Sequence, residues 1–93
     1  MLKRRRAARK AKLEADLHQL IGDRASAQQR VTEALEPLRR EDDYLFYSAA
    51  LELKAVTSGQ LSWMDLATQA HLKRKAFESA VESLFRAVDL AIG

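Results

Sequence analysis

Apolar residues recur along the chain in steps of three and four, the spacing that brings them onto one face of an α-helix. They also stay in phase over intervals of eighteen residues, which correspond to five turns of an ideal helix. The residues in phase are Leu13, Val31 and Ala49; Leu17, Leu35 and Leu53; and Leu20, Leu38 and Val56. This regularity predicts one long helix from about residue 3 to about residue 57.

Two residues inside this predicted helix are poor helix formers. Gly22 costs roughly 1 kcal/mol relative to alanine in a helix interior, and Pro37 costs about 3 kcal/mol. Neither residue is flanked by residues typical of loops. We therefore interpret Pro37 as a kink and Gly22 as a tolerated weak point. The alternative is a break at Gly22 that folds residues 1–21 back as a separate helix and gives a three-helix bundle.

Gly59 and Ser62 mark a turn, because signals for the end of one helix and the start of the next follow each other directly. Gly59 suits the left-handed conformation that closes a helix. Ser62 suits a helix N-cap, with Asp65 three positions later completing a variant of the capping box. The sequence therefore predicts a turn over residues 58–61 and a second helix over about residues 62–92.

The second predicted helix carries apolar residues at the four-three spacing of a coiled-coil seam. Its members are Ala70, Phe77, Val81, Leu84, Val88 and Ala91, with Arg74 as the one polar residue. A short link between two long amphipathic helices makes them antiparallel neighbours. We expect an all-α fold in which the two helices form an antiparallel hairpin or coiled coil.

The two predicted helices differ in length, roughly 80 Å for the first and roughly 45 Å for the second at 1.5 Å per residue. The second helix can therefore cover only about residues 28–57 of the first. The middle of the first helix is also apolar around most of its circumference, which implies a second contact, either with a folded-back leader or with another protein. The residues expected to make these contacts with a partner helix are Leu13, Leu17, Leu20, Ile21, Tyr44, Tyr47 and Leu51.

The formal net charge of +3 conceals an uneven distribution. No acidic residue occurs before Glu14, whereas residues 13–93 contain nine basic and thirteen acidic side chains. The basic residues of the first twelve positions are Lys3, Arg4, Arg5, Arg6, Arg9, Lys10 and Lys12. The distribution predicts a basic arm over residues 1–12 and a single helical domain over residues 13–93. Such an arm is typical of contact with phosphate, anionic lipid or an acidic protein surface, or of a solvated helix start.

Residues that could carry out chemistry are few. The chain has no cysteine, and neither His18 nor His71 has further ligands at a spacing typical of a metal site. The three glycines are too far apart to form a phosphate-binding loop. We expect no catalytic residue, metal or cofactor, and therefore no enzyme. Because no apolar stretch is long enough for a signal peptide or a membrane span, we expect a cytoplasmic protein.

Three stretches of the chain combine a basic start, a long helix and a turn into a second amphipathic helix. They are Met1-Leu2-Lys3-Arg4-Arg5-Arg6, the helix that reaches Leu45-Phe46, and Leu61-Ser62-Trp63-Met64-Asp65-Leu66. In these features the chain resembles the small coiled-coil stalk proteins of flagellar and type III secretion export machines. The resemblance implies a rod at the export ATPase that contacts the export gate and has no catalysis of its own.

Two functional hypotheses follow. The first is a helical adaptor or assembly protein that docks on larger protein partners or on copies of itself through coiled-coil faces. The second is a small phage, plasmid or ribosome-associated protein that binds nucleic acid through residues 1–12, because their seven cations could neutralise several phosphates.

Overall fold

The computed structural model describes residues 2–93, which form five α-helices joined by short turns. The helices are α1 (Leu2–Leu20), α2 (Arg24–Arg40), α3 (Tyr44–Ser58), α4 (Leu61–Lys73) and α5 (Phe77–Ile92). Met1, the first residue of the predicted basic arm, lies outside the described residues. The expected all-α class is confirmed over this part of the chain.

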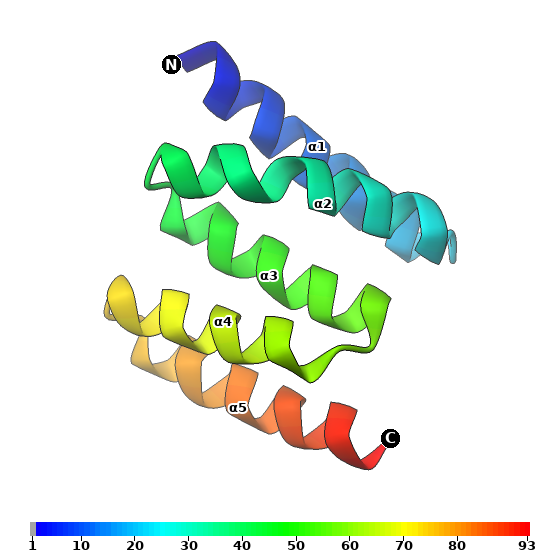
Figure 1. The fold of residues 1–93 in the computed structure, drawn as a ribbon, viewed down its shortest axis with the longest axis vertical. Helices are drawn as coiled ribbons and strands as arrows, with labels where there is room; N and C mark the ends of the chain where they lie inside the picture. Colours follow the sequence, from blue (N-terminus) through cyan, green and yellow to red (C-terminus); the bar gives the residue numbers. More distant parts are fainter. Residues whose placement is uncertain (1) are drawn as a thin grey trace.

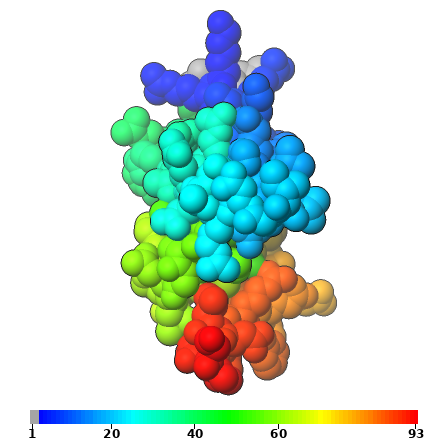
Figure 2. All heavy atoms as spheres, turned by 90° about the vertical axis from the view of Figure 1, so that its right-hand side faces the viewer, coloured from blue at the N-terminus to red at the C-terminus, as the bar shows by residue number. Residues whose placement is uncertain are grey.

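The helices are stacked side by side in the order of the sequence, and each runs antiparallel to the one before it (Figure 1). α1 lies at one end of the stack and α5 at the other. The stack measures 38 × 31 × 17 Å, and Figure 2 shows it from the side as a narrow column coloured in sequence order from blue to red. Each inner helix therefore packs against a helix on either side, whereas α1 packs mainly on α2, with a smaller contact to α3, and α5 packs mainly on α4.

Three of the four turns have the same backbone geometry. Each contains one residue in the left-handed region, namely Gly22 (φ 85°), Asp42 (φ 54°) and Lys75 (φ 60°). The next residue donates its N–H to the carbonyl five positions earlier, as in the Schellman motif that ends many helices. These bonds are Asp23 N–H to His18 O at 2.8 Å, Asp43 N–H to Leu38 O at 3.0 Å, and Ala76 N–H to His71 O at 2.8 Å.

These turns correct the two-helix prediction. The single helix expected over residues 3–57 is wrong, because the chain turns at Gly22 and again at Asp42. The alternative break at Gly22 is confirmed, but the bundle has five helices rather than three. The helix expected over residues 62–92 is also divided, at Lys75. Asp42 and Lys75 were missed because they are not glycines, and left-handed backbone is uncommon for other residues.

The turn expected over residues 58–61 is confirmed, although its cap differs from the prediction. Gly59 has φ 70° and donates its N–H to the carbonyl of Ala55 at 2.8 Å. α4 begins at Leu61, so the N-cap is Gln60 and Ser62 lies within the first turn. The side chain of Gln60 instead accepts a hydrogen bond from the indole N–H of Trp63 at 2.7 Å.

The core consists mainly of small residues and falls into two clusters. The first, between α1, α2 and α3, contains Ala8, Ala15, Val31, Ala34, Leu38 and Ala50. The second, between α3, α4 and α5, contains Leu51, Ala55, Met64, Ala67 and Ala70. Alanine at most contact positions lets neighbouring helix axes approach closely. α3 takes part in both clusters, which explains why its sequence is apolar around most of its circumference.

The caps of α2 and α4 generate a prediction about stability. Asp23 caps α2, because its Oδ1 accepts a hydrogen bond from the backbone N–H of Ser26 at 3.2 Å. Asp23→Ala should lower the melting temperature by about 3–8 °C. Ser62→Ala should leave it unchanged, because Ser62 is exposed and caps no helix. Thermal unfolding followed by circular dichroism compares the two variants, and a larger effect of Ser62→Ala would contradict this description of the caps.

The pH dependence of the Asp23 effect has a defined sign. Hydrogen bonds from Ser26 hold the pKa of Asp23 below its ordinary value of 3.8. A lowered pKa means that the stabilisation is present above the unfolded-state value and is lost as the pH falls through the folded-state value. The difference in melting temperature between the wild type and Asp23→Ala should therefore be full at pH 7 and shrink at about pH 2.

Candidate functional site

α5 directs its large apolar side chains away from the stack. The exposed residues are Phe77 (63%), Val81 (50%), Leu84 (51%), Phe85 (67%), Val88 (53%) and Ile92 (81%). Their spacing of three and four residues places them on one face that runs the length of the helix. We call these six residues the α5 stripe. Four residues of the predicted seam, Phe77, Val81, Leu84 and Val88, lie on this exposed face, so the expectation that they pack on the first predicted helix is wrong. Ala70, another residue of that seam, is buried in the second core cluster.

The side of α5 that packs on α4 is formed by smaller residues. Ala80 and Ser83 are buried, and Ala87 and Leu90 lie partly buried against the second core cluster. The hydroxyl groups of Ser83 and Thr68 lie 2.5 Å apart in a buried hydrogen bond between the two helices. Small residues and this polar contact determine which face of α5 turns inward.

An acidic edge flanks the α5 stripe. Glu78, Glu82 and Asp89 are four and seven residues apart, so they share one side of the helix next to Phe85. All three are exposed. The only basic residue of α5, Arg86, forms an ion pair with Glu52 of α3 and a longer one with Glu82 at 3.9 Å. The outward face of α5 is thus apolar with a negative border.

α1, at the other end of the stack, also presents an apolar face to the exterior. Leu13 (56%), Leu17 (58%), Leu20 (84%) and Ile21 (69%) are all largely exposed, Ile21 following directly after the helix. Arg6 and Lys10 continue the same line toward the N-terminus at positions three and four residues apart. We call Leu13, Leu17, Leu20 and Ile21 the α1 stripe. These four predicted contact residues have no covering helix in the described chain.

Residues 2–12 form the first half of α1, continuous with Leu13. Arg9 binds the nearly buried Asp43 through two hydrogen bonds of 2.7 and 3.1 Å and lies over the ring of Phe46, 4.3 Å from its centroid. The bond to Asp43 raises the pKa of the Arg9 guanidinium. Arg5 donates to the carbonyl of Glu41 at 2.8 Å. Part of the predicted basic arm therefore holds α1 against the turn between α2 and α3.

The remaining basic side chains of α1 divide into two groups. Lys12 pairs with Asp16 on the same helix at 2.6 Å. Among the described residues, none forms an ion pair with the other four, which are exposed: Lys3, Arg4, Arg6 and Lys10. In Figure 2 the N-terminal part of α1, in dark blue, extends its side chains beyond the rest of the column. These four cations are available for contact with another molecule.

Tyr44, Tyr47 and Leu51 lie in the interior or at its edge. Leu51 is only 1% exposed and belongs to the second core cluster, so the helices that it contacts belong to its own chain. The rings of Tyr44 and Tyr47 meet edge to face with centroids 5.9 Å apart, and both are partly buried. The second contact expected for this segment is made by other helices of the same chain.

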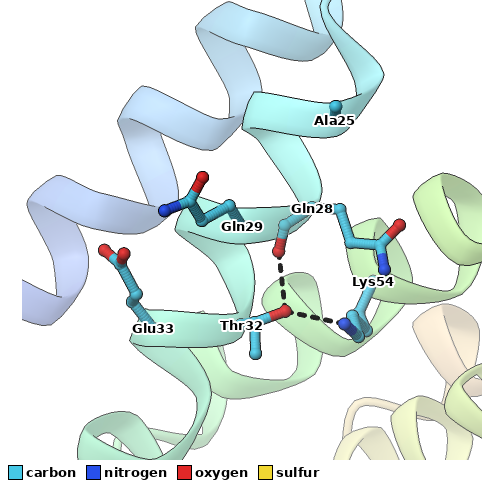
Figure 3. A pocket seen from close by; sticks show the side chains of 6 residues that line it. All are labelled: Ala25, Gln28, Gln29, Thr32, Glu33 and Lys54. Atoms are coloured by element: carbon cyan, nitrogen blue, oxygen red, sulfur yellow. Dashed lines mark hydrogen bonds between the residues drawn. The ribbon is translucent and has the colours of Figure 1, made fainter.

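A surface hollow of about 570 Å³ lies between α2 and α3. It is lined by Ala25, Gln28, Gln29, Thr32, Glu33 and Lys54 (Figure 3). Lys54 is buried and donates a hydrogen bond of 2.7 Å to the hydroxyl of Thr32, which in turn donates to the carbonyl of Gln28 at 2.6 Å. Its ammonium also lies 5.6 Å from the centre of the Trp63 ring. These contacts give Lys54 a role in joining α2, α3 and α4.

His71 forms the one buried histidine contact with an acid among the described residues. Its Nε2 lies 2.5 Å from a carboxylate oxygen of Glu52, and its Nδ1 accepts a hydrogen bond from Arg74 at 3.2 Å. His71 is 4% exposed, so a substrate has no direct access to its ring. Glu52 also binds Arg86, and the network therefore connects α3, α4 and α5. Sequence reasoning did not find this pair, which lies nineteen residues apart.

Within residues 2–93, no group of three or more histidine, cysteine, aspartate or glutamate side chains is placed to hold a metal ion. Over the same residues, none of the helices combines the length and the apolar character that crossing a bilayer requires. The comparison of the chain with protein-family models, curated proteins and solved structures found no match.

The sequence contains a second pattern, besides that of the large apolar residues, which indicates the inward face of α5. Ala80, Ser83 and Ala87 are spaced by three and four residues and form a line of small side chains opposite the stripe. A helix that packs closely on its neighbour needs such a line, because larger residues hold the axes apart. Counting apolar positions alone assigned the larger residues to the core.

This orientation predicts a large loss of stability from a substitution at one residue and almost none from a substitution at the next. Ala80→Leu should destabilise the protein by about 1–3 kcal/mol, because the extra atoms have no space between α4 and α5. Val81→Gln should change the free energy of unfolding by less than about 0.5 kcal/mol, because Val81 is exposed. Urea unfolding at about 5 µM protein measures both, and a greater loss for Val81→Gln would mean that α5 is turned the other way.

Proposed function

We propose that this protein is a helical adaptor or assembly protein that binds other protein chains through the outward faces of its end helices. The observation that carries the proposal is the orientation of α5, which turns phenylalanine, valine, leucine and isoleucine outward and packs through alanine and serine, with Leu90 the one large residue on its inner side. A helix stabilised only within its own chain would have the opposite arrangement. The α5 stripe is therefore the main binding surface in this proposal.

The size of the α5 stripe supports the proposal. Six large apolar side chains, each at least half exposed, present roughly 500 Å² of contiguous apolar surface, the size of the largest apolar patch on a typical monomer, and such patches are often functional. Its polar border is also typical of protein contact sites, in which a polar rim surrounds an apolar centre. The smaller α1 stripe offers a second surface of the same kind at the other end of the stack.

We further propose that the protein acts without catalysis of its own and resides in the cytoplasm. A role in a flagellar or type III secretion export machine is a narrower proposal, which depends on the resemblance of the basic start and the turn before α4 to stalk proteins. The stack of five short helices differs in shape from the long hairpin that this resemblance implies. The adaptor proposal does not depend on it.

A comparison of variants tests the adaptor proposal. Val81→Glu with Val88→Glu places two charges in the α5 stripe, while Gln29→Glu with Gln69→Glu adds the same charge at exposed positions outside it. Each protein serves as bait in extracts of its source, and the retained proteins are quantified by mass spectrometry. We expect at least one protein to be retained by the wild type and the control and to fall about tenfold with the stripe variant. Identical sets for all three baits would contradict the proposal.

A second candidate function is nucleic-acid binding, which is favoured by the four exposed cations of α1 that form no ion pair within residues 2–93. Replacing Arg4, Arg6 and Lys10 with glutamine removes three of them without touching the Arg9 contact to Asp43. Binding to a 30-base-pair duplex and to single-stranded RNA should weaken at least tenfold in about 50 mM salt, and the salt dependence should become shallower. If the wild type binds neither probe at this salt concentration, this second function is excluded.

A further inference from the structure

Both ends of the stack leave an apolar face without a covering helix. In stacks of repeated helical units, a terminal unit normally has a polar outer face that keeps the protein soluble. Here the two end helices expose the α1 stripe and the α5 stripe instead. Within one chain these two faces cannot cover each other, because α1 and α5 lie at opposite ends of the molecule (Figure 1).

The charges beside the two stripes are of opposite sign. The first half of α1 carries Arg6 and Lys10 in line with its stripe, both exposed and neither in an ion pair with another described residue. The α5 stripe is bordered by Glu78, Glu82 and Asp89. An exposed apolar face with a negative border fits a partner face with positive charge, because complementary potentials favour the correct pairing and like charges oppose the wrong one.

Pairing of α5 with α5 of a second copy lacks this complementarity. In an antiparallel two-fold pair the same edge of each helix lies beside its counterpart, so the acidic edges of the two copies would face each other. The only basic side chain of α5, Arg86, is already paired with Glu52 within its own chain. In charge, the α1 stripe is therefore a better partner for the α5 stripe than the α5 stripe of a second copy would be.

We propose that copies of this chain associate head to tail, with the α5 stripe of one copy packed against the α1 stripe of the next. The two stripes share the four-three spacing of a coiled-coil seam when the helices run parallel. The matching positions are Leu13 with Leu84, Leu17 with Val88, and Leu20 with Ala91. In this register Arg6 and Lys10 stand at the level of Phe77 and Val81, next to Glu78 and Glu82.

The contact buries about 1,000 Å² in total, at the small end of specific interfaces. Contacts of this size include weak and transient ones, so the association is measured at concentrations up to about 300 µM. The two surfaces are different, so every complex keeps one free α1 stripe and one free α5 stripe. Such a heterologous contact continues into longer assemblies unless it closes into a ring.

This inference rests on the proposed protein-binding role of the end helices and names the occupant of the α5 stripe. The first test reverses charges. Glu78→Lys with Glu82→Lys, and separately Arg6→Glu with Lys10→Glu, should each weaken association at least fivefold. All four substitutions in one chain should restore it. Sedimentation velocity from about 10 to 300 µM in 50 mM salt measures the association, and circular dichroism checks that each variant keeps its helix content.

The charge reversal separates the two possible self-contacts. If α5 pairs with α5 instead, Glu78→Lys with Glu82→Lys should not weaken association, and Arg6→Glu with Lys10→Glu should have no effect. Either result would overturn the head-to-tail contact. A wild-type chain that remains monomeric at 300 µM would overturn it as well.

A second test locates the contact directly and uses the absence of cysteine from the chain. One protein carries Leu17→Cys and the other carries Val88→Cys, and a short bis-maleimide cross-linker is added to each alone and to the mixture. The mixture should give at least five times more covalent dimer than either protein alone. Equal yields from Val88→Cys alone and from the mixture would overturn the proposed pairing.

The failure of this inference can be told apart from failure of the proposed function. If the wild type does not associate with itself but Val81→Glu with Val88→Glu still loses a retained protein, the α5 stripe binds another partner and only the inference is wrong. If neither self-association nor a stripe-dependent partner is found, both proposals are wrong. If both are found, the stripe binds a second copy and a further protein.

Discussion

Close packing of neighbouring helices over alanine and serine is the constraint on which the rest of this structure depends. Alanine predominates in both core clusters, and Ala80 and Ser83 form the contact of α5 with α4. Small residues let the helix axes approach, but they bury little apolar area for each helix. A thin interior of this kind leaves the larger apolar residues of α1 and α5 at the surface, where they are available to other chains.

The polar contacts compensate in part for this small core. Arg9 and Asp43 hold α1 to the turn between α2 and α3, and Lys54 connects α2 with α3 and α4. The network of His71, Glu52 and Arg86 connects α3, α4 and α5. Most of these bonds join helices that are next to each other or one apart in the stack. Each helix is therefore stabilised mainly by contacts with the helices near it in the stack, and the two end helices have the fewest such contacts.

Sequence reasoning could predict the helical class, the turn at Gly59 and the exposed residues of the α1 stripe. It could not predict the turns at Asp42 and Lys75, because their left-handed backbone is stabilised by the carbonyls of the preceding helix rather than by a glycine. It also assigned Phe77, Val81, Leu84 and Val88 to the interior, because hydrophobic periodicity cannot say which of two faces is covered. Only the packing of α5 on α4 resolves that question.

The small residues in the core also govern how this sequence can change over time. At positions such as Ala34, Ala67 and Ala80 the neighbouring helix leaves no space for a larger side chain, so the restriction concerns volume more than apolar character. Glycine and serine are the main substitutes of similar size. Elsewhere on the helices many residues are compatible with the same stack. Related chains could therefore diverge widely in sequence while a sparse pattern of small residues preserves the spacing of the helices.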